Sequence, residues 1–385
     1  MAPGARGASA SVALELPPVE VIAIEVEPLS VPLRDPFVIA SGRIDVTRAA
    51  LVRATVEDVA GRRAGGLGEA AALPPVTRED QPDLLAAIAR AAPALRGMRL
   101  QSSADPWGAL SAAVARALPD SAVARAGVET AILDAWCRAA GVPFARALAG
   151  AAGGPLVSSL MTDITLPISD PVRMVEAARR HHAAGFDCFK VKVGRDWRAD
   201  RASLRAVGAA IPGARIRLDA NAGFNAADAL ALLDAVLADG LIVECYEQPC
   251  AADDLAGMAE VTARSAVPVV ADESFRGAAD LERIVSARAA HGVNLKLVKL
   301  GGTVAALELG RRARAAGLRL MAGAMVETRV GLLAMAHVVA ALGGVDWIDL
   351  DTAFLLAGDP FQGGWSVSGP RIELLDEPGL GVEMR

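Results

Sequence analysis

The sequence predicts an α/β protein whose core is a (β/α)8 barrel, preceded by an α+β capping domain that the C-terminal tail completes. Between residues 151 and 360, short β-rich runs alternate with alanine-rich runs of helical periodicity, a pattern typical of βαβ units. Eight of these runs end at intervals of 24 to 30 residues, which is the arithmetic of a (β/α)8 barrel. A doubly wound open sheet is the alternative, but it usually brings a glycine-rich phosphate loop, which the sequence lacks. The predicted strand ends are Thr162, Lys192, Asp219, Glu247, Asp272, Lys296, Met325 and Asp349.

The capping domain is predicted over residues 17–150, after a lead-in of small and polar residues, 1–16, that we expect to be disordered. Its strands lie in the runs VIAIEVEPLSVPL and AALVRATVED, and its helices in PDLLAAIARAAPAL and AVARAGVETAILDAWCRAAG. Residues 33–46 and 65–76 are predicted to be long loops that cover a site. The tail, residues 361–385, is again strand and turn and is expected to return to this domain.

Composition limits the kinds of partner. The chain has 385 residues, 53% of them hydrophobic, and a net charge of −6, so it lacks the basic field that nucleic-acid binding needs. Its longest apolar run is far shorter than the ~20 residues that cross a bilayer. The four cysteines show no CxxC or zinc-ligand spacing and are expected to be free thiols. We therefore expect a cytoplasmic homo-oligomer that binds a small molecule, with no nucleic-acid or membrane partner.

The run CFKVKVGRD, residues 188–196, places two lysines inside an otherwise apolar strand. Strand side chains alternate between faces, so Lys190 and Lys192 share one face, about 6–7 Å apart, where like charges repel. Such a pair needs anions opposite it.

Those anions are predicted at three successive strand ends, Asp219, Glu247 and Asp272. Strand ends converge in a barrel, and three close carboxylates repel unless a hard cation neutralises them, which favours Mg²⁺, with Mn²⁺ as a possible substitute. The alternative is that each acid caps the helix that follows it.

Lysines from the strands on either side, Lys192 and Lys296, would then flank the metal. Lys190 and the metal would disfavour the charged form of Lys192 and let it accept a proton. The alternative is an ion network, in which we expect Lys190 to take part while Lys192 stays unpaired. A metal between two lysines suits proton removal from the carbon next to a carboxylate, through an enediolate, and return of the proton on the other face inverts that carbon. Return on the same face, or expulsion of a β-substituent, gives isomerisation or elimination instead.

This set of residues resembles the enolase superfamily, muconate lactonizing enzyme subgroup, over residues 19–385. The KxK pair, the acids on three successive strands and the later lysine carry the resemblance. It implies Mg²⁺ ligands at Asp219, Glu247 and Asp272, acid/base roles for Lys192 and Lys296, and supporting roles for Lys190, Asn221 and Glu273.

The eighth strand end, DLDTAFLLAGDP, offers Asp349 and Asp351 two residues apart, so both side chains face inward. A second carboxylate pair suits a substrate ammonium, although either residue could cap the next turn. The pair is similar to the motif by which dipeptide epimerases hold the α-ammonium of a dipeptide. We therefore expect a Mg²⁺-dependent dipeptide epimerase. N-succinylamino-acid racemase or o-succinylbenzoate synthase activity, or a non-catalytic ligand-binding barrel, is the alternative.

Four further positions near strand ends have open roles. Met325 is a candidate for substrate contact, and Thr162 and Asp163 could touch the substrate carboxylate or only close a turn. Glu327 could orient the lysine of the preceding strand or pair with Arg329.

Substrate preference is expected to come from the capping loops. Arg43 could reach a second substrate carboxylate, as an Ala-Glu epimerase would need, or could be a surface residue paired with Asp45. The sequence leaves these two interpretations open.

Overall fold

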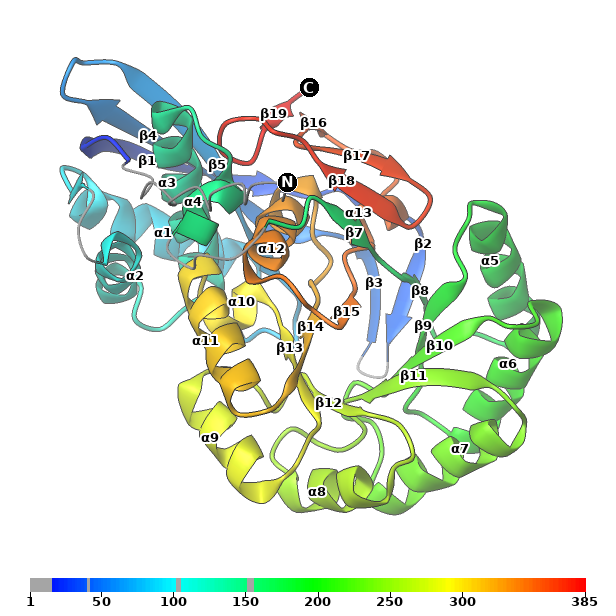
Figure 1. Cartoon of the computed structure of the whole chain (residues 1–385). Coiled ribbons are helices and arrows are strands. Elements are labelled where there is room, and N and C mark those ends of the chain that lie inside the picture. Colours follow the sequence, from blue (N-terminus) through cyan, green and yellow to red (C-terminus); the bar gives the residue numbers. More distant parts are fainter. Residues whose placement is uncertain (1–15, 40–41, 102–104, 151–155) are drawn as a thin grey trace, which may run out of the picture.

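The structure, a computed structural model, describes residues 16–39, 42–101, 105–150 and 156–385. The predicted disordered lead-in therefore lies outside the described residues, except for Leu16. Elements are labelled in Figure 1.

A curved sheet of eight parallel strands, in chain order, forms the centre of the molecule, and helices cover its outer face (Figure 1). The first and last strands approach each other where the amide of Asp163 donates to the carbonyl of Ile348 at 3.2 Å. This barrel, with an α+β domain beside it, confirms the predicted fold class. The strands are β8 (Ile164–Leu166), β9 (Cys188–Lys192), β10 (Arg215–Asp219), β11 (Ile242–Glu247), β12 (Val269–Ala271), β13 (Gly292–Leu295), β14 (Arg319–Ala322) and β15 (Trp347–Ile348). The helices are α5 (Pro171–Ala183), α6 (Trp197–Ala210), α7 (Ala226–Ala238), α8 (Leu255–Arg264), α9 (Ala278–Ala287), α10 (Leu297–Leu300), α11 (Thr303–Ala315), α12 (Arg329–Leu342) and α13 (Thr352–Leu355).

The barrel interior changes character along its axis. One layer of it is an apolar cluster separate from the main core, formed by Cys245, Val270, Met321 and Trp347. Three of these residues, Cys245, Val270 and Trp347, each lie two positions before a predicted strand end. Because side chains alternate, the next inward positions are the strand ends themselves, which are charged at Glu247, Asp272 and Asp349.

The predicted end of the first barrel strand, Thr162, is wrong. The run before it forms β7 (Ser159–Met161), which pairs with the C-terminal strand β18 (Arg371–Leu374) rather than with the barrel. The first barrel strand is the next run, β8, which ends at Leu166. Thr162 therefore precedes the barrel instead of lying at its mouth. The other seven strands end within three residues of the predicted positions.

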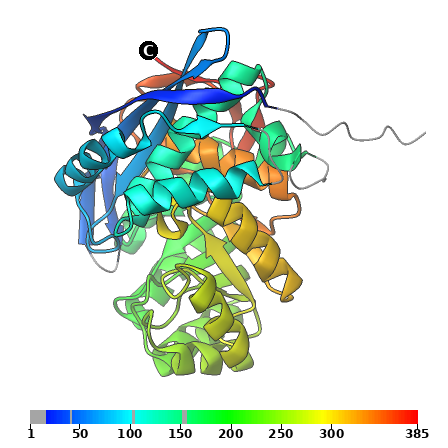
Figure 2. The ribbon, with the colours of Figure 1, turned by 90° about the vertical axis from the view of Figure 1, so that its left-hand side faces the viewer.

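The capping domain is a four-stranded sheet, in the order β5-β4-β1-β6, with helices packed against it (Figure 2). Glycines allow helix α3 to approach this sheet closely, since a Cβ at Gly68 would lie 2.0 Å from the carbonyl oxygen of Gly127. The strands are β1 (Val19–Leu29), β4 (Arg48–Asp58), β5 (Arg63–Ala72) and β6 (Arg99–Leu100), and the helices are α1 (Gln81–Leu95), α2 (Pro106–Ala117), α3 (Ala122–Ala140) and α4 (Phe144–Gly150).

Both stretches predicted to be loops contain strands. The described part of 33–46, residues 33–39 and 42–46, belongs to a hairpin of β2 (Pro32–Ile39) and β3 (Gly42–Val46). The first part of 65–76 belongs to β5, and only the residues after Ala72 form turns. Proline and glycine in these runs indicated loops, but a two-stranded hairpin and an edge strand tolerate both.

The C-terminal tail joins both parts of the molecule. It forms β16 (Phe361–Gly363), β17 (Trp365–Ser368), β18 and β19 (Val382–Met384), of which β17 and β18 make a sheet with β7. Its last residues lie against α3, where the amide of Leu380 donates to Asp134 Oδ1 and Arg138 donates to the carbonyl of Val382, both at 2.6 Å.

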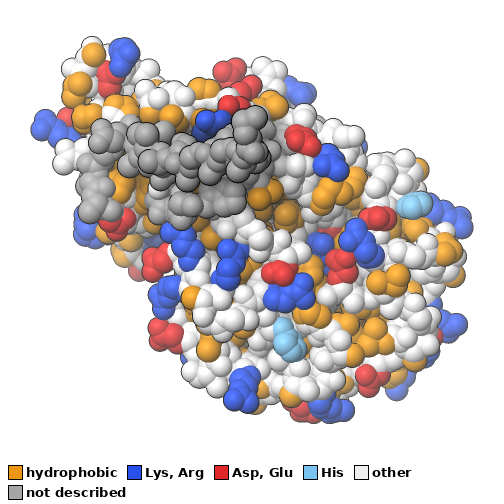
Figure 3. Space-filling model, viewed as in Figure 1, with side chains coloured by type: hydrophobic (Ala, Val, Ile, Leu, Met, Phe, Trp, Pro, Cys, Tyr) orange, Lys and Arg blue, Asp and Glu red, His pale blue; other side chains and the backbone are white. Residues whose placement is uncertain are grey.

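The cysteines, the helices and the surface charge of the described residues bear on the expectations from composition. The four cysteines are buried and free. Within the described chain, no helix has both the length and the apolar character to cross a membrane. On the face shown in Figure 3, basic and acidic side chains are interspersed.

Two buried glutamates of the capping domain hold the first turns of two barrel helices. Glu69 on β5 accepts hydrogen bonds at 3.0 Å from the amides of Thr328 and Gly331 at the start of α12. Glu129 on α3 accepts one at 2.9 Å from the amide of Val304 at the start of α11. Burial raises the pKa of both carboxyl groups. Acceptors at a helix N-terminus satisfy amides that the helix leaves unpaired, so each glutamate joins the cap to the barrel.

We expect Glu69→Ala to destabilise the protein by about 2–4 kcal/mol, because it leaves buried amides without an acceptor. Glu69→Gln keeps one acceptor oxygen and should lose clearly less. Thermal unfolding of both variants checks this. Equal melting temperatures for Ala and Gln would show that the contacts at α12 contribute nothing.

Candidate active site

The charged strand ends converge on a pocket beneath the capping domain. The barrel supplies its floor, and β2 and the turns after β5 supply its roof. Predicted site residues that line it are Lys190, Lys192, Asn221, Asp272, Glu273, Lys296, Met325 and Asp349. Three others, Asp219, Glu247 and Asp351, are fully buried next to these residues.

Lys190 lies at the centre of a ring of carboxylates. Its Nζ is 2.9 Å from Asp219, 2.7 Å from Glu247 and 2.7 Å from Asp349. Burial lowers the pKa of this ammonium, but the three anions outweigh burial and raise the pKa well above its usual value. These anions are what makes burial of the KxK pair possible.

Each flanking lysine is paired with one predicted metal ligand. Lys192 Nζ lies 2.6 Å from Asp219, so the expectation that Lys192 stays unpaired is wrong. Lys296 Nζ lies 2.8 Å from Asp272. Both lysines thus approach the acid cluster, from β9 and from the residue after β13.

A fourth ammonium, which the sequence reasoning missed, contacts the same acid. Lys299 Nζ donates to the carbonyl of Asp272 at 2.7 Å and also contacts its carboxylate. A signal was present in the composition. The chain contains only four lysines, and all four are in this site, while every other basic side chain except histidine is arginine.

The three predicted ligands do not cap helices, so that alternative is wrong for them. The helices that follow their strands, α7, α8 and α9, have Asn225, Asp254 and Gly277 at their N-cap positions. The acids instead face the cations inside the barrel.

Unusual backbone follows two of the acid-bearing strands. Asn221 and Gln248 have φ of 42° and 35°, in the left-handed region that side chains other than glycine seldom adopt. Gln248, which the sequence reasoning also missed, accepts hydrogen bonds from the amides of Asp272 and Ser274 at 2.8 and 3.1 Å. Its side chain therefore fixes the start of the next acidic segment.

The electrostatics of the acid cluster fit a divalent cation. Burial, and then repulsion from Asp219, raise the pKa of Glu247 to about 8. Burial would also raise the pKa of Asp219, but Lys190 and Lys192 outweigh it and hold that pKa below its usual range. All-oxygen donors with excess negative charge are the ligands that a hard cation prefers.

Buried oxygen atoms around the acid cluster also fit the binding of a cation. Among the described residues, Asn221 Oδ1 and Glu273 Oε2 have no hydrogen-bond partner. The other atoms of these side chains bond each other, Nδ2 to Oε1 at 3.2 Å. Buried oxygens normally have a partner, so the site has unused acceptor capacity.

A second acid cluster lies beside Lys190. Carboxylate oxygens of Asp163, Asp349 and Asp351 all lie within 4.8 Å of one another, so this group has the spacing to hold a metal ion. In the described structure Asp219, Glu247 and Asp272 do not reach this spacing, and each of them is paired with a lysine. Burial, and then Asp349, raise the pKa of Asp351 to about 7. Asp351 precedes α13, yet within the described chain its side chain makes no capping hydrogen bond there and accepts one from the amide of Thr165 at 2.5 Å.

Residues with open roles mostly have structural partners. The hydroxyl of Thr162 accepts a hydrogen bond at 2.9 Å from the amide of Leu350. Glu327 accepts one at 2.9 Å from the amide of Met325, and Arg329 pairs with Asp359 at 2.7 Å, so Arg329 is not the partner of Glu327. Burial raises the pKa of Glu327 to about 8 and the charge of Lys296 opposes this rise, so Lys296 stays a candidate partner.

Arg43 is 62% exposed and lies 2.9 Å from Asp45. It is absent from the described lining of the pocket. Of its two interpretations, the structure fits the surface ion pair.

Comparison with known proteins adds to this geometry. The chain matches the family "Enolase C-terminal domain-like" over residues 173–385. The aromatic dipeptide epimerase of Herpetosiphon aurantiacus is 38% identical, over 95% of this chain and 99% of that protein. The substrate-liganded L-Ala-D/L-Glu epimerase of Bacillus subtilis superposes with a TM-score of 0.86 at 31% identity, over 94% of this chain and 98% of that one. A dipeptide epimerase of Enterococcus faecalis, complexed with Mg and L-Leu-L-Tyr, superposes with a TM-score of 0.85 at 30% identity, over 94% of this chain and 99% of that one.

The charged strand ends of this capped barrel, in a chain this similar to named epimerases, define an enzyme. The chain belongs to the enolase superfamily, as the motifs of the sequence predicted.

We expect Lys190→Met to destabilise the protein by about 3–5 kcal/mol, because removing one partner of a buried ion network leaves the others uncompensated. Lys192→Met is the matched variant and should lose less, since Lys192 contacts one carboxylate where Lys190 contacts three. Thermal unfolding of both variants in a chelator decides between them. A smaller loss for Lys190→Met than for Lys192→Met would contradict the central role of Lys190.

Proposed function

We propose that this enzyme epimerises dipeptides at the α-carbon next to the carboxylate that the metal site holds. The observation that carries the proposal is the presence of two separate charged groups in one pocket. One is a set of carboxylates flanked by lysines, and the other is the pair Asp349 and Asp351. A free dipeptide offers the matching groups, a carboxylate at one end and an ammonium at the other.

The metal is part of the proposal. Asp219, Glu247 and Asp272 would hold Mg²⁺, with Mn²⁺ as a possible substitute, because they are buried oxygen donors with repelling charges. When bound, the cation supplies Lewis-acid stabilisation of the charge that develops on the substrate carboxylate. The Mg complex of the Enterococcus faecalis relative supports this assignment.

Lys192 and Lys296 are the proposed acid/base pair. They approach the acid cluster from β9 and from the end of β13, so they suit attack on opposite faces of a carbon placed between them. One lysine removes the α-proton from one face, and the other lysine then gives a proton to the opposite face, which inverts the carbon. Their ion pairs with Asp219 and Asp272 would loosen once a cation shares those carboxylates.

The roof of the pocket favours apolar side chains in the substrate. Phe37 and Ile39 from β2, with Leu73 and Val76 from the turns after β5, face the charged floor. Arg43, which would suit a glutamate side chain, is paired on the surface. We propose that dipeptides with apolar side chains are better substrates than acidic ones.

The alternative within the superfamily is action on N-succinylated amino acids or o-succinylbenzoate synthesis. Those substrates have no free ammonium, and Asp349 and Asp351 would then lie against no substrate cation.

We expect Lys192→Ala and Lys296→Ala each to abolish epimerisation, because each removes the proton donor or acceptor for one face. The measurement is exchange of the α-hydrogen for deuterium in D₂O, followed by NMR across a library of L,L-dipeptides. Wild type should exchange apolar dipeptides in the presence of Mg²⁺ and lose activity in a chelator. Near-native epimerisation by either variant would contradict the two-lysine mechanism.

The four-lysine composition provides a control that does not depend on turnover. Labelling lysine with ¹³C at Cε should give four resonances, all from the site. Mg²⁺ should shift these resonances, since each of the four lysines contacts at least one proposed ligand. Four resonances that ignore Mg²⁺ would show that the metal assignment is wrong.

We expect replacement of both Asp349 and Asp351 with Asn to lower kcat/KM for a free dipeptide at least tenfold, because each lost hydrogen bond to a charged group is worth roughly 1.5–3 kcal/mol. An N-acylated analogue carries no charge at that nitrogen and should lose little. The check is kcat/KM for both compounds on wild type and variant. Equal losses on both compounds, or a wild-type preference for the acylated compound, would overturn the ammonium-binding role.

A further inference from the structure

One arginine, Arg217, binds the segment that carries Asp349 and Asp351 from the N-terminal side of the barrel. Arg217 lies on β10, two residues before Asp219, and its side chain is 8% exposed. Its Nη1 lies 2.9 Å from Asp163 Oδ2 and donates at 2.9 Å to the carbonyl of Ile348, the residue before Asp349. A single guanidinium nitrogen thus joins the start of β8 to the end of β15.

Neighbouring contacts fix the same segment from the side of β8. The amide of Asp163 donates to the same carbonyl of Ile348, and the hydroxyl of Thr162 accepts from the amide of Leu350 at 2.9 Å. The backbone on both sides of Asp349 is therefore anchored, which determines where its carboxylate points.

Charge gives Arg217 a second role. Asp163, Asp349 and Asp351 lie within 4.8 Å of one another. In the described structure, Lys190 pairs with Asp349 and Arg217 pairs with Asp163. Without Arg217, the carboxylate of Asp163 would face two others with no cation of its own, and repulsion would displace the pair or neutralise part of it.

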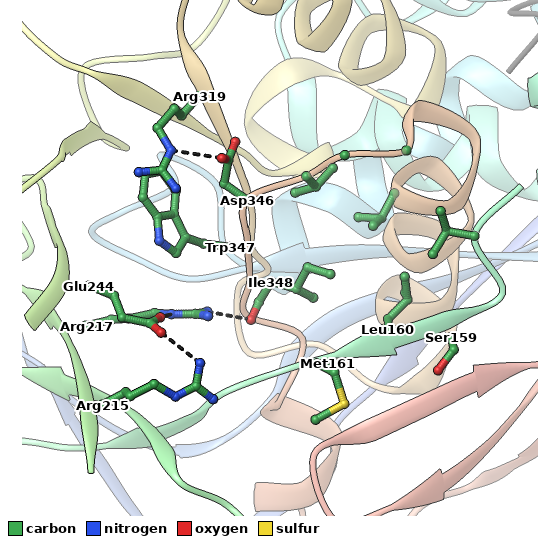
Figure 4. Close-up of a pocket in the computed structure, with 15 residues that line it drawn as sticks. Ser159, Leu160, Met161, Arg215, Arg217, Glu244, Arg319, Asp346, Trp347 and Ile348 are labelled. Atoms are coloured by element: carbon green, nitrogen blue, oxygen red, sulfur yellow. Dashed lines mark hydrogen bonds and ion pairs between the residues drawn. The ribbon is translucent and has the colours of Figure 1, made fainter. Parts of the chain in front are cut away.

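The opposite side of Arg217 borders a cavity of ≈ 550 Å³ at the N-terminal end of the barrel (Figure 4). Figure 4 shows Arg217 directed toward Ile348, with Glu244 and Arg215 beside it. Glu244 binds both arginines at 2.8 Å. The cavity is large enough to admit a small cation to the place of the guanidinium if the arginine side chain is shortened.

We propose that Arg217 is a positioning residue for substrate-ammonium binding: it fixes Asp163 and Ile348 from the N-terminal side of the barrel, and so sets the position of Asp349 and Asp351. The inference rests on the proposed function. Arg217 contacts neither the reacting carbon nor the lysines that serve it.

The test is Arg217→Ala, measured as kcat and KM for an apolar dipeptide with saturating Mg²⁺. We expect KM to rise at least about tenfold, a loss of about 1.4 kcal/mol, with a smaller change in kcat. Guanidinium chloride at tens of millimolar, far below denaturing concentrations, should restore KM, whereas urea and NaCl should not. Arg217→Lys, which keeps the charge but loses the planar fork, should be intermediate.

Arg215→Ala is the matched control. Arg215 lies on the same strand and shares Glu244, but its other partner is Asp187. The variant Arg215→Ala should leave KM for the dipeptide near the wild-type value. An equal rise in KM for Arg215→Ala, or no guanidinium rescue of folded Arg217→Ala, would overturn the inference in favour of a general packing role.

A readout independent of turnover separates this inference from the function proposal. The Cε resonance of Lys190, which contacts Asp349, should shift in Arg217→Ala and return with guanidinium. If the wild-type enzyme epimerises no dipeptide, the proposed function fails. The role of Arg217 is then decided by two other measurements on wild type and Arg217→Ala: the Kd for a dipeptide from calorimetry, and the Lys190 Cε resonance. An unshifted Lys190 resonance overturns the positioning role.

Discussion

Charge balance inside the barrel is the constraint on which the rest of the structure depends. The upper interior is filled by carboxylates and a few cations, where an ordinary barrel would place branched apolar side chains. Lys190 holds Asp219, Glu247 and Asp349 together, and Arg217 does the same for Asp163. Removing one partner of a buried ion network leaves a charge uncompensated, so Lys190 and Arg217 each determine the placement of several strands.

Much of the site could be predicted because it depends on local periodicity. Alternation along a strand placed Lys190 and Lys192 on one face, and the regular spacing of strands brought Asp219 and Asp272 to one end. These features need only the sequence near each strand. The fold class was predicted from the eight strand ends and their regular spacing along the sequence.

What could not be predicted depends on partners far away in the chain. Thr162 was misplaced because β7 pairs with β18, some two hundred residues later. The pairing of Lys192 with Asp219 and the role of Gln248 are properties of the assembled barrel, since no local pattern reveals which acid a lysine will meet. The cap hairpin was missed because its proline and glycine are compatible with either a loop or an edge strand.

The two buried glutamates of the cap bear on how substrate enters. Swinging the whole cap away from the barrel would expose Glu69 and Glu129 and strip acceptors from the first turns of α11 and α12, at about 1–3 kcal/mol for each orphaned amide. Opening of the whole capping domain as a hinged lid is therefore unfavourable in free energy. The roof residues Phe37 and Ile39 lie instead on a two-stranded hairpin outside the four-stranded sheet of the cap. A displacement of that hairpin alone would uncover the pocket and leave the contacts of Glu69 and Glu129 with α12 and α11 intact.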